Sequence, residues 1–424
     1  MPRLSLLALL ACLVVLAGCA APEGLEGERE EPEPPGPVET DDRIHTVQLY
    51  QTGEEVSLPI LSLREQNSLT LEFDVVGTTA NQPLDVQFRR VPQRGEQNLV
   101  PTEYLTGFDR DEIFDSDPSG NTAVPYVHYR YTFPNTGIGF RLGGVYTLTV
   151  SDPGGPALFE RTFFVTEDLV ETEMLLGSRL AEAGAVGQAI QPSARLRPLG
   201  ALANEDPFQF TVCFFRDGQV DALRCSQEPS IAELAVFGFY LPRSEAFQPV
   251  PPIYRLDLGV LGLSPEVEEV DVVAMPPTAL MQPDFAAFGG EIFDPVLLSG
   301  AAIDNGYREA GRADDEAEYV DVTFRYVPPG ERELPGPVYV RGGFTEGKTS
   351  ARNRLEWRPD EKRYVGTVLV KQGIYAYDFP APRAPPSRQP VALGQPSVYT
   401  ALVFYQDLTR FADRLVGVQS AVAR

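Results

Sequence analysis

Few residues of this 424-residue chain have side chains suited to catalysis or metal binding. The two histidines are His45 and His128, and neither stands near a serine, a cysteine or a second metal ligand at a recognisable spacing. His128 also falls on the polar side of an alternating run that predicts a strand. The sequence therefore predicts no catalytic residue and no metal site.

Two acidic segments have residue types that bind cations or transfer protons. Residues 115–121 begin like a calcium loop, but Tyr126 stands at the position where such a loop needs a bidentate glutamate. A polar turn is the preferred interpretation.

The second acidic segment, residues 314–318, could hold a carboxylate pair, although a solvated loop before a strand explains its composition as well. Its acids are Asp314, Asp315, Glu316 and Glu318. No cofactor is predicted.

The four cysteines are more informative. Cys12 lies in the apolar run Leu4 to Leu16, which has the pattern of a signal peptide and is too short to span a bilayer. The run ends in Leu-Ala-Gly-Cys19, which resembles the bacterial lipoprotein box, where the cysteine becomes the acylated first residue. We therefore expect residues 1–18 to be a lipoprotein signal peptide and Cys19 to be lipidated. An ordinary secretory signal is the alternative.

Residues 19–43 are expected to form an acidic, proline-rich tether. From Ala20 to Arg43 the chain has five prolines, nine acidic residues and two arginines, with almost no bulky apolar side chain. Such a segment cannot build a core and should be extended. Ala20, rather than an acidic residue, follows the cysteine, which resembles the sorting signal of outer-membrane lipoproteins.

Cys213 and Cys225 are the two cysteines in the part of the chain that we expect to be exported and folded. They flank the turn signal Asp217-Gly218 between two apolar runs, so they could form a disulfide across one hairpin. A two-residue turn would place them out of register, which favours two free thiols, whereas a three-residue loop centred on Gln219 would align them.

The rest of the chain reads as all-β. It is 43% apolar with 37 glycines and 39 prolines, which suits many short strands separated by turns. Residues 69–75 and 126–133 alternate apolar and polar side chains, as half-buried antiparallel strands do. Residues 171–182 are the main candidate helix. The formal net charge of −25 makes nucleic acid an unfavourable partner.

Boundaries follow from turn-rich segments near residues 165–168 and 328–331. They predict tandem antiparallel β-sandwiches of the immunoglobulin-like kind. The expected domains are an N-terminal sandwich at 44–168, a middle β domain at 169–331 and a C-terminal immunoglobulin-like sandwich at 332–424.

Short sequence fragments recur in a fixed order along residues 44–420. They are 44–50, 57–63, 69–74, 104–108, 126–129, 133–135, 144–146, 161–165, 304–307, 318–324, 338–344, 371–377 and 413–417. In order and spacing these fragments resemble the type IX secretion system plug protein family. The resemblance implies a non-enzymatic protein that docks on the periplasmic mouth of the large outer-membrane translocon barrel and closes its pore. It would be held at the outer membrane by its lipid and would face the periplasm.

An outer-membrane glycan-binding lipoprotein is the alternative. Residues 338–344, Trp357 and residues 371–375 also resemble immunoglobulin-like modules that bind α-glucans. Sugar platforms need exposed aromatic rings, and Trp357 is the single tryptophan of the chain. A tryptophan that covers the edge of a sandwich explains it more simply.

Overall fold

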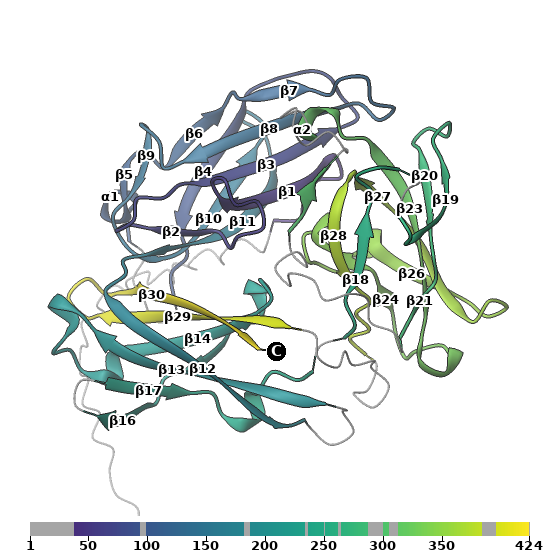
Figure 1. Ribbon diagram of the computed structural model, residues 1–424. Helices are drawn as coiled ribbons and strands as arrows, with labels where there is room; N and C mark the ends of the chain where they lie inside the picture. The colour runs from purple at the N-terminus through teal and green to yellow at the C-terminus, as the bar shows by residue number, and fades with distance from the viewer. Residues whose placement is uncertain are drawn as a thin grey trace, which may run out of the picture. The chain divides into compact units, whose positions relative to one another are not determined.

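The computed structural model describes residues 38–93, 99–181, 187–233, 236–249, 251–261, 264–286, 300–304, 313–383 and 396–423. Strands dominate these residues, and most neighbouring strands are antiparallel (Figure 1). The predicted all-β class is confirmed. No helix within these ranges is long and apolar enough to cross a membrane.

The first sandwich is formed by a four-stranded and a five-stranded sheet. Aromatic residues of both sheets share its core: the rings of Phe73 and Phe159 lie 4.9 Å apart. The first sheet has the order β1 (Ile44–Gln51), β3 (Leu69–Val76), β8 (Tyr126–Phe133), β7 (Ser116–Pro118). The second has the order β2 (Ile60–Ser62), β11 (Ala157–Thr166), β10 (Gly144–Ser151), β4 (Leu84–Arg90), β6 (Arg110–Ile113). The short elements α1 (Pro101–Tyr104), β5 (Leu105–Gly107) and β9 (Ile138–Phe140) complete this part.

Strand β3 is buried on both faces. Leu71 and Phe73 lie in the sandwich core, as the alternation predicts. Glu72 and Asp74, on the opposite face, are also buried. The predicted alternation is therefore present, but its polar face is covered by other parts of the chain.

The second sandwich is formed by two four-stranded sheets. Its core combines side chains such as Leu196 and Phe239 from one sheet with Phe210 and Val403 from the other. One sheet has the order β12 (Val170–Leu180), β13 (Gln188–Pro198), β17 (Val236–Tyr240), β16 (Pro229–Glu233). The other has the order β15 (Arg224–Ser226), β14 (Phe210–Arg216), β29 (Ser397–Asp407), β30 (Ala412–Ala423).

The helix expected at residues 171–182 is wrong over its described part, because β12 occupies Val170–Leu180. Thr172, Met174 and Leu176 alternate with more exposed neighbours along this strand. This period of two outweighs the helix-forming glutamates and leucines, since Val170, Met174 and Leu176 then face the same side of the sheet.

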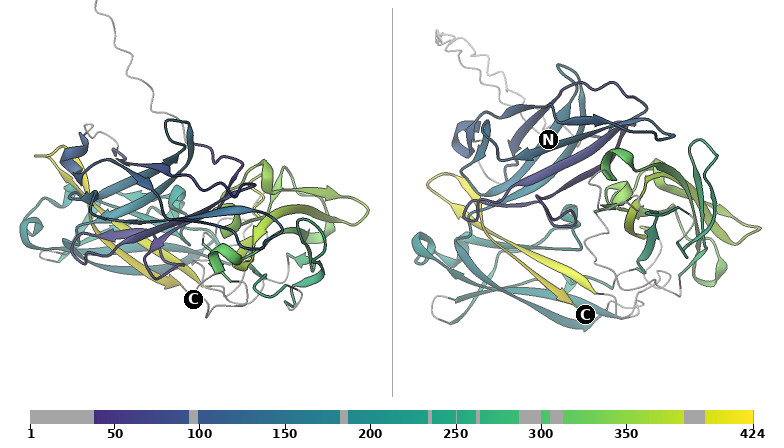
Figure 2. Two further views of the ribbon diagram at one scale, coloured as in Figure 1. Left: turned by 90° about the horizontal axis from the view of Figure 1, so that it is seen from above. Right: turned by 45° about the horizontal axis from the view of Figure 1, so that its top comes forward.

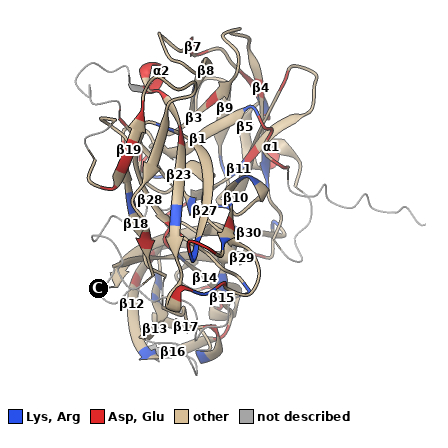
Figure 3. Ribbon diagram, turned by 90° about the vertical axis from the view of Figure 1, so that its right-hand side faces the viewer, with Lys and Arg blue, Asp and Glu red and all other residues tan. Residues whose placement is uncertain are grey.

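The third sandwich surrounds a core that contains Phe324, Tyr326 and Tyr377. Its smaller sheet has the order β18 (Tyr254–Asp257), β28 (Gly373–Asp378), β22 (Ala302–Ile303), and β25 (Arg341–Gly342) also pairs with β28. Its larger sheet has the order β19 (Val267–Asp271), β20 (Thr278–Met281), β23 (Tyr319–Val327), β27 (Arg363–Lys371), β26 (Arg354–Arg358), β24 (Val338–Tyr339), with β21 (Asp284–Phe285) beside β23. The one-turn helix α2 (Ala313–Glu316) precedes β23, and its acids and those of β19 are red in Figure 3. Short 3-10 helices lie at Gly200–Leu202, Pro207–Gln209, Val220–Ala222, Arg243–Glu245, Pro329–Glu331, Gly343–Thr345 and Ala351–Asn353.

The sheets depart from the linear division predicted at residue 331. The C-terminal strand β29 pairs with β14 of the second sandwich, with Phe210 opposite Tyr405. In the third sandwich β23, which precedes residue 331, pairs with β27, which follows it. Figures 1 and 2 show the yellow C-terminal strands beside the teal strands of the second sandwich. The third sandwich is therefore an insertion in the chain of the second, and the immunoglobulin-like character of 332–424 stays a prediction.

Candidate functional site

Charged side chains gather on one face of β3 and β8. The two strands are antiparallel, and their register sets Asp74 opposite His128 and Glu72 opposite Arg130. Side chains directly opposite each other in an antiparallel pair lie close together. The alternation thus aligns two acid–base pairs side by side.

The third sandwich covers this face. Lys371, at the end of β27, places Nζ 2.7 Å from Asp74 Oδ2, and Tyr319 Oη donates a hydrogen bond to the same oxygen at 2.6 Å. Asp74 and Tyr319 are 0% exposed and Lys371 is 1% exposed. A carboxylate so far from water keeps its charge only where a cation and hydrogen-bond donors offset its desolvation.

Arg130 connects the first sandwich to α2. Its Nε donates to Glu72 Oε1 at 2.5 Å, and its Nη2 donates to Asp314 Oδ2 at 3.0 Å. Tyr50 Oη donates to the other oxygen of Glu72 at 2.6 Å. The guanidinium therefore bridges carboxylates from two parts of the chain.

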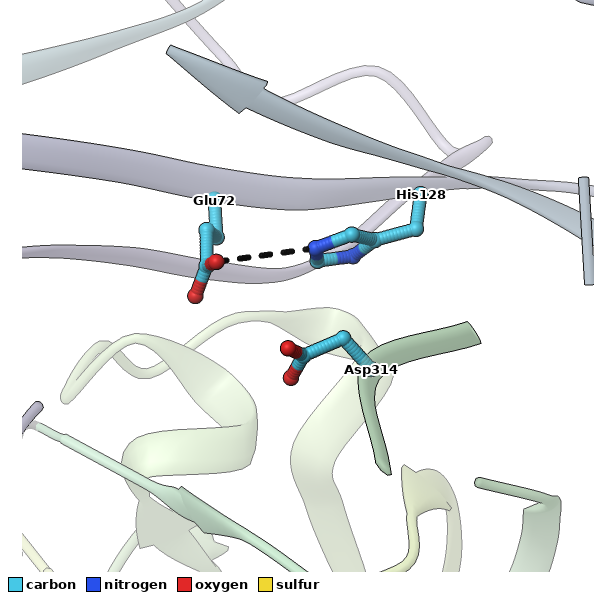
Figure 4. Close-up of side chains that lie close together, drawn as sticks. All are labelled: Glu72, His128 and Asp314. Atoms are coloured by element: carbon cyan, nitrogen blue, oxygen red, sulfur yellow. Dashed lines mark ion pairs between the residues drawn. The ribbon is translucent and has the colours of Figure 1, made fainter. Parts of the chain in front are cut away.

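His128 lies among these carboxylates (Figure 4). Its Nδ1 is 2.8 Å from Asp74 Oδ1. Its Nε2 is 3.7 Å from Glu72 Oε1, too far for a hydrogen bond, and this buried atom has no hydrogen-bond partner among the described residues. We call Glu72, Asp74, His128, Arg130, Asp314 and Lys371 the buried charge cluster.

The pKa values in the cluster follow from this packing. Burial opposes the charged form of His128, but Asp74 and Glu72 raise its pKa to about 9. Burial likewise opposes the charged form of Glu72, but His128, Tyr50 and Arg130 lower its pKa to about 2. The pKa of Asp314 is raised, because burial and the charge of Glu72 outweigh the nearby cations. At neutral pH His128 is accordingly an imidazolium and Glu72 a carboxylate.

Backbone contacts continue the same interface beyond the cluster. The carboxylate of Glu318 accepts hydrogen bonds from the backbone N–H of Ala123 at 2.6 Å and of Val124 at 3.2 Å. Tyr126 Oη donates to the carbonyl of Ala317 at 2.8 Å. The acidic segment before β23, for which the sequence left a carboxylate pair or a solvated loop open, holds the first and third sandwiches together.

The structure also locates the cysteines singled out by the sequence. Cys213 and Cys225 are joined by a disulfide and stand directly opposite each other on β14 and β15. The connection between these strands is longer than either short turn considered for it and contains the 3-10 helix Val220–Ala222. Cys19 lies outside the described residues, so its lipidation stays a prediction.

Trp357 packs against the third sandwich. Its ring centroid lies 5.0 Å from that of Tyr364, and its side chain contacts the surrounding core. Trp357 therefore covers the sheet to which its own strand belongs. This agrees with the simpler interpretation of the sequence, in which the tryptophan covers the edge of a sandwich. His45 is the other histidine; burial lowers its pKa, and its ring lies 5.8 Å from the ring of Tyr319.

Sequence reasoning missed the buried charge cluster. The alternating runs of β3 and β8 contain its first-sandwich members, and pairing the two runs in register would have set Asp74 against His128. Lys371 and Asp314 are 297 and 184 residues from their partners Asp74 and Arg130, so no local pattern connects them. The sequence therefore placed the charged face of β3 and β8 in solvent.

These features define an all-β protein of antiparallel sandwiches held together by a buried polar contact, and comparison with known proteins shows what its first sandwich is similar to. Residues 44–167, the whole first sandwich, match the family described as type 9 secretion system plug protein 1st domain. The first sandwich thus matches the type IX secretion system plug family, which confirms the predicted resemblance for these residues. A plug-related role in type IX secretion and a place in the cell envelope follow.

One solved structure shares nearly the whole fold. It is the crystal structure of a hypothetical protein from Parabacteroides merdae ATCC 43184, with a TM-score of 0.78 and 21% identity. The match covers 91% of this chain and 98% of that one. Similarity at this level shows a common fold and does not carry a function. No curated protein matches the chain.

Proposed function

We propose that the chain is a non-enzymatic plug subunit of the type IX secretion system. It docks on the periplasmic side of the large outer-membrane translocon barrel and closes its pore. The observation that carries this proposal is the family match over residues 44–167, which places a plug first domain in the chain. In the secretion machinery, such a domain would dock on the barrel and close its pore.

The buried charge cluster supports a binding role. Its cations and carboxylates pair with one another, and its central members Asp74 and Lys371 are shielded from solvent. Groups arranged in this way stiffen a contact between sandwiches. A stiff surface loses little conformational entropy on docking, so more of its contact energy appears as affinity.

The proposed anchor adds to this affinity. With residues 1–18 removed, a lipid on Cys19 would hold the body at the outer membrane through residues 19–43. Residues 40–43 already contact the folded domains, so at ~3.1 Å per residue for polyproline geometry the stretch from Cys19 to Glu39 would reach roughly 65 Å. Holding the folded domains close to the outer membrane raises their effective concentration near the barrel. A weak interface with the barrel can then still be well occupied.

Affinity capture tests the docking step. An affinity-tagged full chain is isolated from detergent-solubilised outer membranes, and the co-purifying proteins are identified. We expect the large translocon barrel. Recovery of the chain without the barrel, together with its retention on an α-glucan column, would favour the glycan-binding alternative instead.

Membrane fractionation tests the anchor separately. Cys19→Ala should move the chain from the membrane to the soluble envelope fraction in cells that lack the barrel, where docking cannot retain it. Cys12→Ala, inside the expected signal peptide, is the matched control and should leave the chain in the membrane fraction. Sedimentation of the Cys19→Ala chain with these membranes would refute lipid anchoring.

A further inference from the structure

Glu72, His128 and Asp314 direct ligand atoms toward one point between the first and third sandwiches. Their nearest carboxylate oxygens and imidazole nitrogen all lie within 4.8 Å of one another. Figure 4 shows the three side chains converging from β3, β8 and α2. We propose that these residues bind a zinc-like divalent transition-metal ion.

His128 is the observation that points to a ligand. Nε2 is buried, has no hydrogen-bond partner within the described ranges, and lies on the side of Glu72 and Asp314. The opposite ring nitrogen, Nδ1, lies 2.8 Å from Asp74 Oδ1. Histidines that bind metals commonly donate their second N–H to a carboxylate, which orients the ring and makes the free nitrogen a better ligand. Asp74 would serve His128 in this way.

The spacing needs only a small adjustment. Two ligands of a tetrahedral zinc ion, each about 2.1 Å from the metal, lie roughly 3.4 Å apart. His128 Nε2 and Glu72 Oε1 are already 3.7 Å apart. Asp314, on the short helix α2, has a side chain that is 30% exposed and can move toward them. Water would fill the fourth position.

Arg130 is the group that a metal must displace. Its guanidinium contacts both Glu72 and Asp314, so it supplies the positive charge that the ion would bring. The Arg130 side chain is 41% exposed and can turn toward solvent. A metal would also replace the proton on His128 Nε2, so metal binding would release a proton.

The donor set selects among metals. One imidazole nitrogen with two carboxylate oxygens suits zinc and its neighbours, whereas calcium prefers six to eight oxygen ligands. Because Glu72 and His128 belong to the first sandwich and Asp314 precedes the third, the bound ion would cross-link the two. The sequence predicted no metal site, since these three residues converge only after folding.

Metal titration of the purified full chain in mild detergent tests the site. We expect one zinc ion to bind saturably and raise the melting temperature, and calcium to do neither. Cobalt bound in place of zinc should give the visible absorption of a four-coordinate ion. His128→Gln and Asp314→Asn each remove a ligand and should weaken zinc binding at least about tenfold, since even the loss of an outer-shell partner typically costs that much. Asp315→Asn, on the same helix, is the matched control and should bind as the original chain does.

Arg130→Gln provides the opposite test, because removing the competing cation should tighten zinc binding. This variant also covers the case in which His128→Gln does not fold. Absence of saturable zinc binding by the original chain would overturn the proposal. So would binding that His128→Gln and Asp314→Asn leave unchanged, or an Arg130→Gln chain that binds zinc more weakly.

Discussion

At the scale of single residues, Asp74 is the central residue of the contact between the first and third sandwiches. It is fully buried and contacts an imidazole, an ammonium and a phenol, from His128, Lys371 and Tyr319. A buried carboxylate with such partners contributes little net stability over a well-packed apolar group, but losing one partner leaves a charge without compensation. The cluster therefore makes this contact specific and sensitive to substitution.

Lys371→Met tests that sensitivity. The change removes the ammonium but keeps most of the buried side chain, so we expect the free energy of unfolding to fall by about 3–5 kcal/mol. Urea unfolding of the full chain measures this. Lys348→Met, at an exposed position, is the control and should change stability by less than about 0.5 kcal/mol. Equal effects of the two substitutions would contradict the role given to Asp74.

The pH dependence of stability tests His128. Its pKa is about 9 in the folded chain, above the ordinary value of 6.5, so its contribution is fully present below pH 6.5 and is lost as the pH rises through 9. We expect the free energy of unfolding to fall across this window, and His128→Gln to flatten that fall. His45→Gln should leave the slope in place, because burial lowers rather than raises the pKa of His45. An unchanged slope in His128→Gln would exclude this role.

At the scale of elements, local pattern predicted strands well and their surroundings poorly. The alternation over residues 69–75 and 126–133 indicated β3 and β8 because period-2 burial is a local property. Whether the polar face of a strand meets water depends on what else packs there, and β27 comes from almost 300 residues further along the chain. The glutamate-rich start of β12 shows the converse error, in which helix propensity was given more weight than alternation.

A substitution at Gly107, at the end of β5, tests how closely β5 approaches Gly137, which directly precedes β9. The φ of Gly107 is +95°, and an added Cβ would lie 2.2 Å from the carbonyl oxygen of Gly137. Gly107→Ala should therefore lower the melting temperature through both backbone strain and a clash with backbone. Gly53→Ala is the matched control, with φ at +89° and open space around the added Cβ. It should cost only the strain, about 1–2 kcal/mol. A larger loss in Gly53→Ala would contradict the described packing.

At the scale of the whole molecule, the third sandwich is inserted into the chain of the second. Turn-rich segments mark where strands end, but they do not indicate which strands pair across more than 180 residues, as β14 and β29 do. The sequence consequently predicted an N-terminal sandwich, a middle β domain and a C-terminal sandwich in a row. The all-β class could be read from composition and alternation, whereas the pairing of β29 with β14 depends on packing in the folded protein.

Single-channel conductance tests most directly whether this protein closes the translocon pore, as we propose. The purified barrel is reconstituted in a planar bilayer, and the full chain is added on the periplasmic side. Our account predicts that current through the open barrel falls to the baseline as the chain binds, and returns when it is washed out. Saturating binding of the chain with undiminished current would show a docked protein that is not a plug, and would contradict the account.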